Sequence, residues 1–256
     1  IGKTTTQLFL MIMASKLYDW KWLMYCPENE PVGDLMIDIA EMYCGKTADK
    51  DFNDRIDHYE FLQAISWAYQ HFTVLTFSET PTVEILLDAC EIYIKKNKVD
   101  GVSLDPLNDL RATSNRNKYD YYYDALSNIR RFVKRHNLVF YLIVHPGTAA
   151  NRLRNDDGKR AAPDMAGVEY GSMFGNRSDN FIVFHRNPQS EQWNQTEIHI
   201  QKVKFQKLVG VPTPEATPVC LFYSYKMRRF RYLNENGTLI DPIQETIKKT
   251  PTNDIF

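Results

Sequence analysis

The residues with the clearest chemical potential stand at the start of the chain, in the stretch "IGKTTT". A Gly-Lys-Thr that enters a helix matches the second half of the phosphate-binding pattern G-x-x-x-x-G-K-[ST], which follows a strand. In that pattern the backbone N–H groups from Gly2 to Thr5, at the positive end of the helix dipole, hold phosphate groups. The Lys3 ammonium would reach the β- and γ-phosphates, and the Thr4 hydroxyl would bind Mg²⁺. The first strand and the first glycine of the loop are expected to precede Ile1.

Polar residues that follow predicted strands complete a site suited to hydrolysis of a nucleoside triphosphate. Asp105, in "VSLDP", would supply the carboxylate that holds the magnesium shell. Glu28, in "YCPENEP", would orient or deprotonate water, with Glu30 as the alternative. His145, in "IVHPG", would bond the γ-phosphate and report its loss to the loop that follows. The carboxyl ends of strands line the ligand crevice of open α/β sheets, which favours these roles.

Each of these motifs also has an ordinary structural explanation. Gly-Lys-Thr starts many helices, Asp-Pro forms turns, an acidic loop is solvated, and a histidine at a strand end is commonly just hydrogen-bonded. What favours the nucleotide site is the alternation of strands and helices in the rest of the chain.

The hydrophobic pattern predicts strands and helices in alternation, followed by strands alone. Helices are expected at 4–18, 30–45, 57–70, 82–97 and 119–137. Strands are expected at 21–26, 72–77, 99–105, 138–145, 180–187, 196–205, 218–225 and 228–233. This order indicates one α/β domain over residues 1–240, with a mostly parallel sheet flanked by helices and extended by antiparallel C-terminal strands. Residues 148–168 are expected to form a long loop, and 241–256 a polar tail.

Composition narrows the class of protein. The chain has 256 residues, of which 43% are hydrophobic and 25% charged, enough for one sizeable core. The net charge of −1 gives no indication of a nucleic-acid partner, so any basic surface must be local. The 4 cysteines are far apart, which argues against a zinc site or a disulfide framework and suits a reducing cytoplasm. No apolar run approaches the length of a membrane span, so no membrane partner is expected.

Taken in order, these motifs resemble the RecA-type helicase domain of the DnaB/Twinkle class, most closely the helicase half of phage primase–helicases. The similarity runs from Gly2 to about Leu233 and is carried by "IGKTTT", "LMYCPEN", "VFYLIVHP", "GSMFGNRSDNFIVFHRN" and "QKVKFQKLVG". It implies a RecA-like P-loop NTPase that acts as an ATP-dependent DNA helicase in replication. It also implies ATP or another NTP with Mg²⁺, a homo-oligomeric, hexameric ring on single-stranded DNA, and a primase domain upstream. The location would be a bacterial or phage-infected cytoplasm, or an organelle.

The chain departs from this family in its last motif. The resemblance places the arginine finger, which acts on the ATP of a neighbouring subunit, at Lys204, and the preceding family lysine at Lys202. Lys207 replaces the family's first glycine there, while Gly210 keeps the second. A lysine carries the charge but lacks the planar fork of arginine, so trans-activation would be weaker, or Lys202 would share the role.

The resemblance also implies a pair of side chains that stack on the nucleotide base. Arg186 in "FHRN" matches one member, and Tyr225 in "FYSY" matches the other, with Tyr223 as the alternative. Two neighbouring clusters have simpler interpretations. "DYYYD" is expected in helix packing, and "YKMRRFR" on a solvent-facing strand surface.

The predicted loop at 148–168 would contact DNA if the resemblance holds. Its cations are Arg152, Arg154, Lys159 and Arg160. Cationic side chains on such a loop neutralise phosphates without reading sequence, which gives salt-dependent binding. The alternative is a solvated loop, in which Asp156 and Asp157 dilute the positive charge.

Two other hypotheses stay open on the sequence. The chain could be a RecA-type ATPase that is not a helicase, for example one that is recombinase-like. It could also be a nucleotide-binding switch with little turnover, for which the lysine at position 204 is the support. The His-Pro pair at 145–146 and the K-x-K-F segment favour the helicase.

Overall fold

The structure, a computed structural model, describes residues 2–112, 117–155, 158–169, 172–187 and 190–248. A parallel sheet in the order β2-β1-β3-β4 is formed by β1 (Trp22–Tyr25), β2 (Phe72–Val74), β3 (Gly101–Leu104) and β4 (Val139–Leu142). β1 and β3 are buried along their whole length, as expected for central strands covered on both faces. Because the strands are parallel, their carboxyl ends meet at one edge of the sheet.

The later part of the chain forms an antiparallel sheet in sequential order. Its strands are β5 (Asn180–His185), β6 (Gln195–Val203), β7 (Val219–Ser224), β8 (Arg229–Leu233) and β9 (Leu239–Ile240). The predicted parallel and antiparallel parts are both confirmed. Among the described residues, however, the antiparallel strands form a sheet of their own instead of continuing the parallel one.

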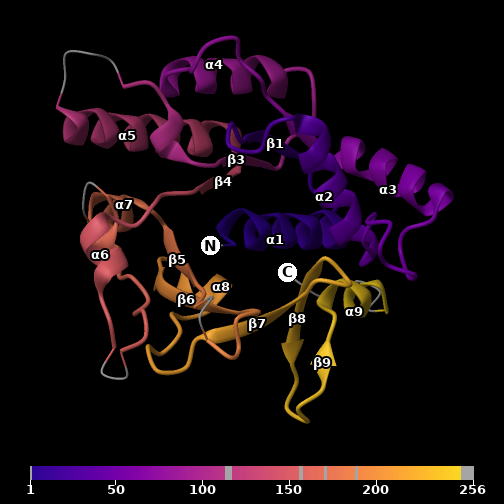
Figure 1. The fold of residues 1–256 in the computed structure, drawn as a ribbon. Helices are drawn as coiled ribbons and strands as arrows, with labels where there is room; N and C mark the ends of the chain where they lie inside the picture. The colour runs from indigo at the N-terminus through magenta and orange to yellow at the C-terminus, as the bar shows by residue number, and fades with distance from the viewer. Residues whose placement is uncertain (1, 113–116, 156–157, 170–171, 188–189, 249–256) are drawn as a thin grey trace.

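Helices cover both faces of the parallel sheet, as Figure 1 shows. α4 (Val83–Ile94) and α5 (Lys118–His136) lie on one face, and α1 (Lys3–Tyr18), α2 (Val32–Cys44) and α3 (His58–His71) on the other. The side chains of β1 alternate accordingly: Leu23 and Tyr25 pack with α4 and α5, whereas Trp22 and Met24 pack with α1 and α2. All the predicted helices and strands occur, with displaced ends.

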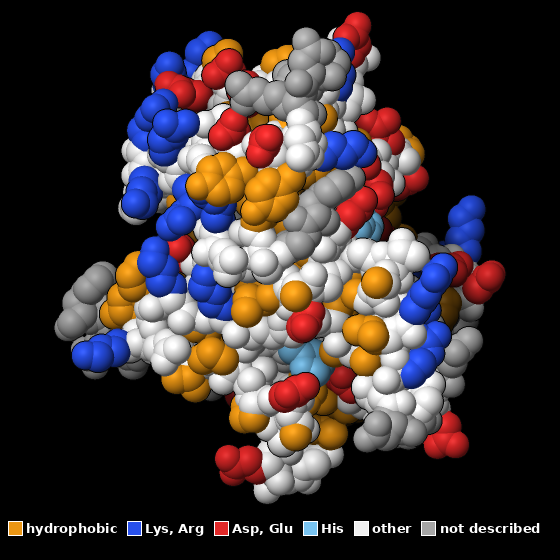
Figure 2. Space-filling view, turned by 90° about the vertical axis from the view of Figure 1, so that its left-hand side faces the viewer, with side chains coloured by type: hydrophobic (Ala, Val, Ile, Leu, Met, Phe, Trp, Pro, Cys, Tyr) orange, Lys and Arg blue, Asp and Glu red, His pale blue; other side chains and the backbone are white. Residues whose placement is uncertain are grey.

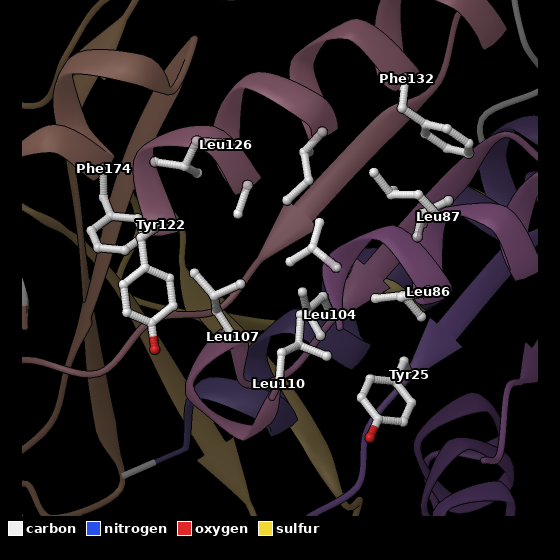
Figure 3. Packing of buried hydrophobic residues seen from close by; sticks show 14 of the residues in the cluster. Tyr25, Leu86, Leu87, Leu104, Leu107, Leu110, Tyr122, Leu126, Phe132 and Phe174 are labelled. Carbon is white, nitrogen blue, oxygen red and sulfur yellow. The ribbon is translucent and has the colours of Figure 1, made fainter. Parts of the chain in front are cut away.

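The core beneath α4 and α5 also holds the turn that follows β3. Figure 3 shows Leu86 of α4 and Leu104 of β3 in this core, together with Leu107 from the turn. Leu107 is 0% exposed, so the turn is anchored to the sheet through its side chain. Tyr121 and Tyr122, from the "DYYYD" stretch, belong to the same cluster, which confirms their predicted place in helix packing.

α1 is packed from two sides and runs between the two sheets (Figure 1). Toward the parallel sheet, Trp22 Nε1 donates to the Met11 carbonyl at 3.2 Å. Toward the antiparallel sheet, Phe9 packs edge-on against Phe230 of β8, with ring centroids 5.4 Å apart. Phe9, Met11 and Ile12 are at most 1% exposed. Close packing on opposite sides fixes where the first turn of α1 lies.

Short regular elements occur where the sequence predicted irregular chain. Within 148–168 the structure has α6 (Thr148–Arg152), a β-bridge between Arg154 and Arg160, and η2 (Met165–Gly167). The prediction of a loop without regular structure was wrong there, because single turns and one-residue bridges leave no periodic pattern in a sequence. The remaining short helices are η1 (Leu107–Asp109), α7 (Met173–Arg177) and α8 (Gln206–Val209).

The predicted polar tail is partly a helix. α9 (Pro242–Lys248) packs beside α1, and its Ile243 is 0% exposed within the core shared by α1 and α2. Residues 249–256 of the tail lie outside the described residues. None of the helices in the described part of the chain is long and apolar enough to cross a membrane.

Arg229, in the predicted solvent-facing cluster "YKMRRFR", is 1% exposed. Its Nη2 lies 2.7 Å from Asp241 Oδ2, and its Nη1 donates to the carbonyls of Met42 and Tyr43, at the end of α2, at 3.4 Å. The prediction was wrong at this residue because a cation can be buried where an opposite charge and a helix C-terminus meet it. The pair ties β8 to α2 and to the start of α9.

Arg229→Ala should therefore destabilise the protein by about 3–5 kcal/mol, because it leaves the Asp241 carboxylate buried without a partner. The matched control is Lys226→Ala. Lys226 Nζ lies 2.9 Å from Asp54 Oδ2, but their side chains are 63% and 67% exposed, so the loss should be about 0–1 kcal/mol. Urea unfolding followed by circular dichroism measures both free energies. Equal losses in the two variants would contradict a special role for the buried pair.

Candidate functional site

The first turn of α1 is shaped to accept an anion. Gly2, the N-cap residue, has φ 81° and ψ 11°, a left-handed conformation that favours glycine. The Thr6 hydroxyl donates to the Gly2 carbonyl at 2.8 Å. The first turn carries no acidic side chain, so the partial positive charge of the helix end is not neutralised by its own residues. Lys3, Thr4 and Thr5 follow directly in this turn.

Two hydrogen bonds bring the sequence-predicted residues together at this turn. Thr4 Oγ1 donates to Asp105 Oδ2 at 2.6 Å, and Lys3 Nζ lies 2.9 Å from His145 Nδ1. When Lys3 is protonated, it is the donor, and the His145 proton is then on Nε2. Residues from the start of α1, from the end of β3 and from beyond β4 thus share one place at the carboxyl edge of the parallel sheet.

Backbone pairing beyond the strand ends holds these residues. The Asp105 N–H donates to the Tyr25 carbonyl at 3.1 Å, and the Ile143 N–H donates to the Leu104 carbonyl at 2.9 Å. His145 therefore lies past the end of β4, on an extended segment that still follows β3, and not within the strand as predicted. Behind the site, the buried Gln7 Nε2 donates to Ser103 Oγ at 2.6 Å, which fixes α1 to β3.

Burial pushes both charged groups of the site toward their neutral forms. The pKa of Asp105, which is 2% exposed, is raised by burial, against the opposing effects of the Thr4 hydrogen bond and the Lys3 charge. The pKa of Lys3 is lowered by burial, against the opposing charges of Asp105 and Glu28. A cation beside Asp105 and an anion beside Lys3 would each favour the charged form. Oxygen donors such as the Thr4 hydroxyl and the Asp105 carboxylate fit Mg²⁺.

The two candidate glutamates differ in what their charges act on. Glu28 is exposed beyond β1, and its charge acts on Lys3 and on Asp109. The Glu30 charge acts instead on Tyr25, whose pKa is raised mainly by burial, then by Asp109 and Glu30. Asp109, in η1, has a pKa raised by burial and by Glu28 and lowered by His145. No sequence pattern pointed to Asp109; its place beside the site comes from the turn after β3.

The residues expected to hold a base line up through an aromatic ring that the sequence did not indicate. A Cβ added to Gly2 would lie 3.9 Å from Arg186 Nη1, so Arg186 borders the first turn of α1. Its Nε donates to the Trp193 carbonyl at 2.6 Å, and its Cζ lies 5.8 Å from the Trp193 ring centroid. The Trp193 ring centroid is 5.2 Å from that of Tyr225. The only signal for Trp193 was a lone tryptophan in the polar stretch "NPQSEQWNQT".

The two candidate tyrosines lie in different surroundings. Tyr225 is 49% exposed, next to Trp193, which is 43% exposed. Tyr223 packs inward, with its ring centroid 5.1 Å from that of Phe230. Of the two, Tyr225 has a ring face available to a ligand.

The cations of the 148–168 segment lie on an exposed projection. Arg152 ends α6, and Arg154 and Arg160 form the bridge of a narrow hairpin whose turn contains Lys159. All of them are exposed. Figure 2 shows the face of the molecule from this side: basic side chains are interspersed with acidic and apolar ones, without one continuous basic surface. The structure places this projection next along the chain from His145.

The structure does not bring Lys204 to the site within the same chain. Lys204 Nζ lies 2.8 Å from Asp179 Oδ1, beyond the end of β6. Lys202, the alternative, donates through Nζ to the carbonyls of Gly175 and Asn176, at 2.7 and 3.1 Å, and so caps α7. Both lysines have partners in their own chain.

Part of the sequence is similar to a known protein. The "Twinkle homolog protein, chloroplastic/mitochondrial" of Arabidopsis thaliana is 27% identical over 109 residues, which is 42% of this chain. The match spans only 14% of the length of that relative. No family model matches the chain.

Solved structures share the fold. The ATPase domain of one DnaB-like helicase superposes with a TM-score of 0.72 at 14% identity, over 91% of this chain and 81% of that one. A DnaB-like replicative helicase, whose structure was determined with its interactions with primase, has a TM-score of 0.70 at 14% identity, over 90% of this chain and 56% of that one. The predicted RecA-like fold and the resemblance to the DnaB/Twinkle class are thereby confirmed.

The raised pKa of Asp105 generates a prediction about stability. The carboxylate opposes folding at any pH above the folded-state pKa, whereas the protonated acid does not. Asp105→Asn should therefore be more stable than the wild type near neutral pH, without nucleotide or metal. The difference should shrink as the pH falls through the folded-state pKa. Denaturant unfolding over a pH series measures it.

Asp19→Asn is the control of opposite sign. The pKa of Asp19 is lowered, chiefly by the hydrogen bond from Lys21, so its carboxylate favours folding at neutral pH. That variant should gain no stability near neutral pH. An Asp105→Asn protein less stable than the wild type near neutral pH would contradict the assignment.

Proposed function

We propose that this chain is the motor domain of an ATP-dependent ring helicase, which translocates along single-stranded DNA during replication. The observation that carries the proposal is the convergence of Lys3, Thr4, Asp105 and His145 at one edge of the parallel sheet. The same fold forms the ATPase domains of the DnaB-like helicases described above. The similarity to a Twinkle homolog points to the same class.

In this proposal the first turn of α1 holds the nucleotide. The N–H groups from Gly2 to Thr5 and the Lys3 ammonium contact the phosphates, and Thr4 and Asp105 hold Mg²⁺. When bound, Mg²⁺ supplies positive charge to the β- and γ-phosphate oxygens. The nucleotide base would lie against the exposed rings and cation at Arg186, Trp193 and Tyr225.

Glu28 and His145 would act at the γ-phosphate. Glu28 would accept a proton from the attacking water, because its charge faces Lys3 from the open side of the site. Without nucleotide, His145 Nδ1 is bonded to Lys3. A γ-phosphate competes for the Lys3 ammonium, so nucleotide binding would release His145 to bond the phosphate itself. His145 would then change partners once in each hydrolysis cycle.

The remaining parts of the proposal concern the assembly. The cations Arg152, Arg154, Lys159 and Arg160 would grip the DNA backbone in the centre of a homo-oligomeric, hexameric ring. Lys204 would leave Asp179 to reach the nucleotide of the next subunit. An upstream primase domain and a cytoplasmic or organellar location complete the proposal. The Lys204–Asp179 ion pair is the observation that favours a low-turnover switch instead. Steady-state ATPase with and without single-stranded DNA separates the two.

Glu28→Gln should retain ATP binding and lower turnover by a factor of about 10²–10⁴, because the amide can hold water but cannot accept its proton. Glu30→Gln is the matched control and should stay close to wild type. Fluorescent-nucleotide binding and a phosphate-release assay provide the two readouts. If Glu30→Gln shows the loss instead, the base is two residues further on; if neither does, it lies elsewhere.

Alanine at Arg152, Arg154, Lys159 and Arg160 together should weaken single-stranded DNA binding and flatten its salt dependence. Each lost phosphate contact lowers the log–log slope by about 0.7. The control removes the same charge at exposed cations of the α4–α5 layer: Lys95, Lys96, Arg131 and Lys134. Fluorescence anisotropy over a salt series measures both. An unchanged slope in the first variant would exclude the projection from the DNA site.

Lys204→Ala should impair turnover, and mixing it with Lys3→Ala subunits should restore part of it. A mixed ring contains interfaces with an intact Lys3 on one side and an intact Lys204 on the other. Lys204→Arg should be tolerated, because arginine supplies the forked donor. ATPase rates of mixed and unmixed samples provide the measurement. Absence of recovery in rings shown to exchange subunits would place Lys204 outside the active interface.

A further inference from the structure

Beyond the carboxyl edge of the sheet, three backbone segments lie side by side. The turn after β3 is joined to the segment after β4 by the Leu107 N–H, which donates to the Ile143 carbonyl at 3.0 Å. That segment is joined to the chain returning from the basic projection by a β-bridge between Pro146 and Val168. The Gly147 N–H also donates to the Gly167 carbonyl at 2.8 Å. The segment that carries His145 is therefore the middle one of the three.

Glu169 spans this arrangement through two of its groups. Its N–H donates to the His145 carbonyl at 3.1 Å, and its Oε2 accepts a hydrogen bond from Asn108 Nδ2 at 2.6 Å. Asn108 belongs to the turn after β3, so the Glu169 carboxylate reaches past the middle segment to the far one. The returning chain is thereby bonded both to the residue that touches Lys3 and to the turn that begins at Asp105.

The short helix η1 distributes its side chains between the site and this contact. Asp105, just before it, accepts from Thr4, and the charge of Asp109 interacts with Glu28 and His145. Asn108 points to Glu169 instead. Because these residues share one turn, a movement of Asp105 or Asp109 that follows a change of nucleotide must also move Asn108. The Asn108–Glu169 bond then displaces the chain that returns from the projection.

We propose that Asn108 and Glu169 are positioning residues that couple the state of the nucleotide to the grip of the 148–168 projection on DNA. This inference rests on the proposed function, since it takes the projection as the DNA contact and the site as an ATPase site. The coupling uses one charge-assisted hydrogen bond between side chains that touch neither ligand. It operates in parallel with His145 and is separable from it by mutation.

The test compares the ratio of single-stranded DNA dissociation constants measured with ADP and with a non-hydrolysable ATP analogue. In Asn108→Ala and Glu169→Ala the ratio should fall toward one, by about fivefold or more, the lower end of coupling between sites. The double variant should lose no more than either single variant, because both break the same bond. ATPase without DNA should stay close to wild type in all three.

Two variants serve as controls. Glu169→Gln keeps an oxygen that can accept from Asn108, so its ratio should stay near that of the wild type. Asn128→Ala removes a comparable exposed contact, from Asn128 Nδ2 to Glu84 Oε1 at 3.3 Å, and should leave the ratio unchanged. If Glu169→Ala does not fold, Glu169→Met keeps the side-chain length without the acceptor and replaces it in the comparison.

The outcomes separate this inference from the function on which it rests. A wild-type protein without ATPase activity, or without nucleotide-dependent DNA binding, would overturn the proposed function and the coupling with it. A wild-type ratio that persists in folded Asn108→Ala and Glu169→Ala would overturn the coupling alone. Loss of DNA-free ATPase in the folded variants would also overturn it, because the two residues would then belong to the hydrolytic site.

Discussion

The burial of α1 between two sheets is the constraint on which the rest of the structure depends. A helix covered on one side can shift over its sheet, whereas α1 is held by Trp22 on one side and by Phe230 on the other. Its first turn therefore has a fixed position relative to β3 and to the segment after β4. The short hydrogen bonds of Thr4 and Lys3 follow from that position. Chemistry at the site is built on packing that lies well behind it.

Desolvation is the main cost of the site in the absence of a ligand. Lys3 and Asp105 are both shifted toward neutrality by burial, and each opposes the shift of the other. A protein selected for stability alone would place apolar side chains there. An oppositely charged ligand beside each group offsets part of this cost, so the same burial that destabilises the free protein strengthens its interaction with phosphate and cation. Site and stability are opposed here, as is common where function needs buried charge.

Much of this arrangement is visible in the sequence, because it depends on short patterns. The ends of apolar runs locate Asp105, His145 and the first turn of α1, and the structure brings them together. Arg229 could not be located in this way. Its burial depends on Asp241 and on the end of α2, which are distant in the chain. Contacts of single side chains between distant segments, such as Arg186 with Trp193, leave no periodic signal either.

The way in which the 148–168 segment leaves the sheet has a consequence for how such proteins diversify. Its two ends run side by side, joined by the bridge of Pro146 with Val168 and by the Gly147–Gly167 hydrogen bond. A segment with adjacent, bonded ends can be lengthened, shortened or recharged at small entropic cost, without moving the strands that carry it. It is in effect an exchangeable cassette. Its interchange between relatives would alter what is gripped while leaving the phosphate chemistry of the scaffold intact.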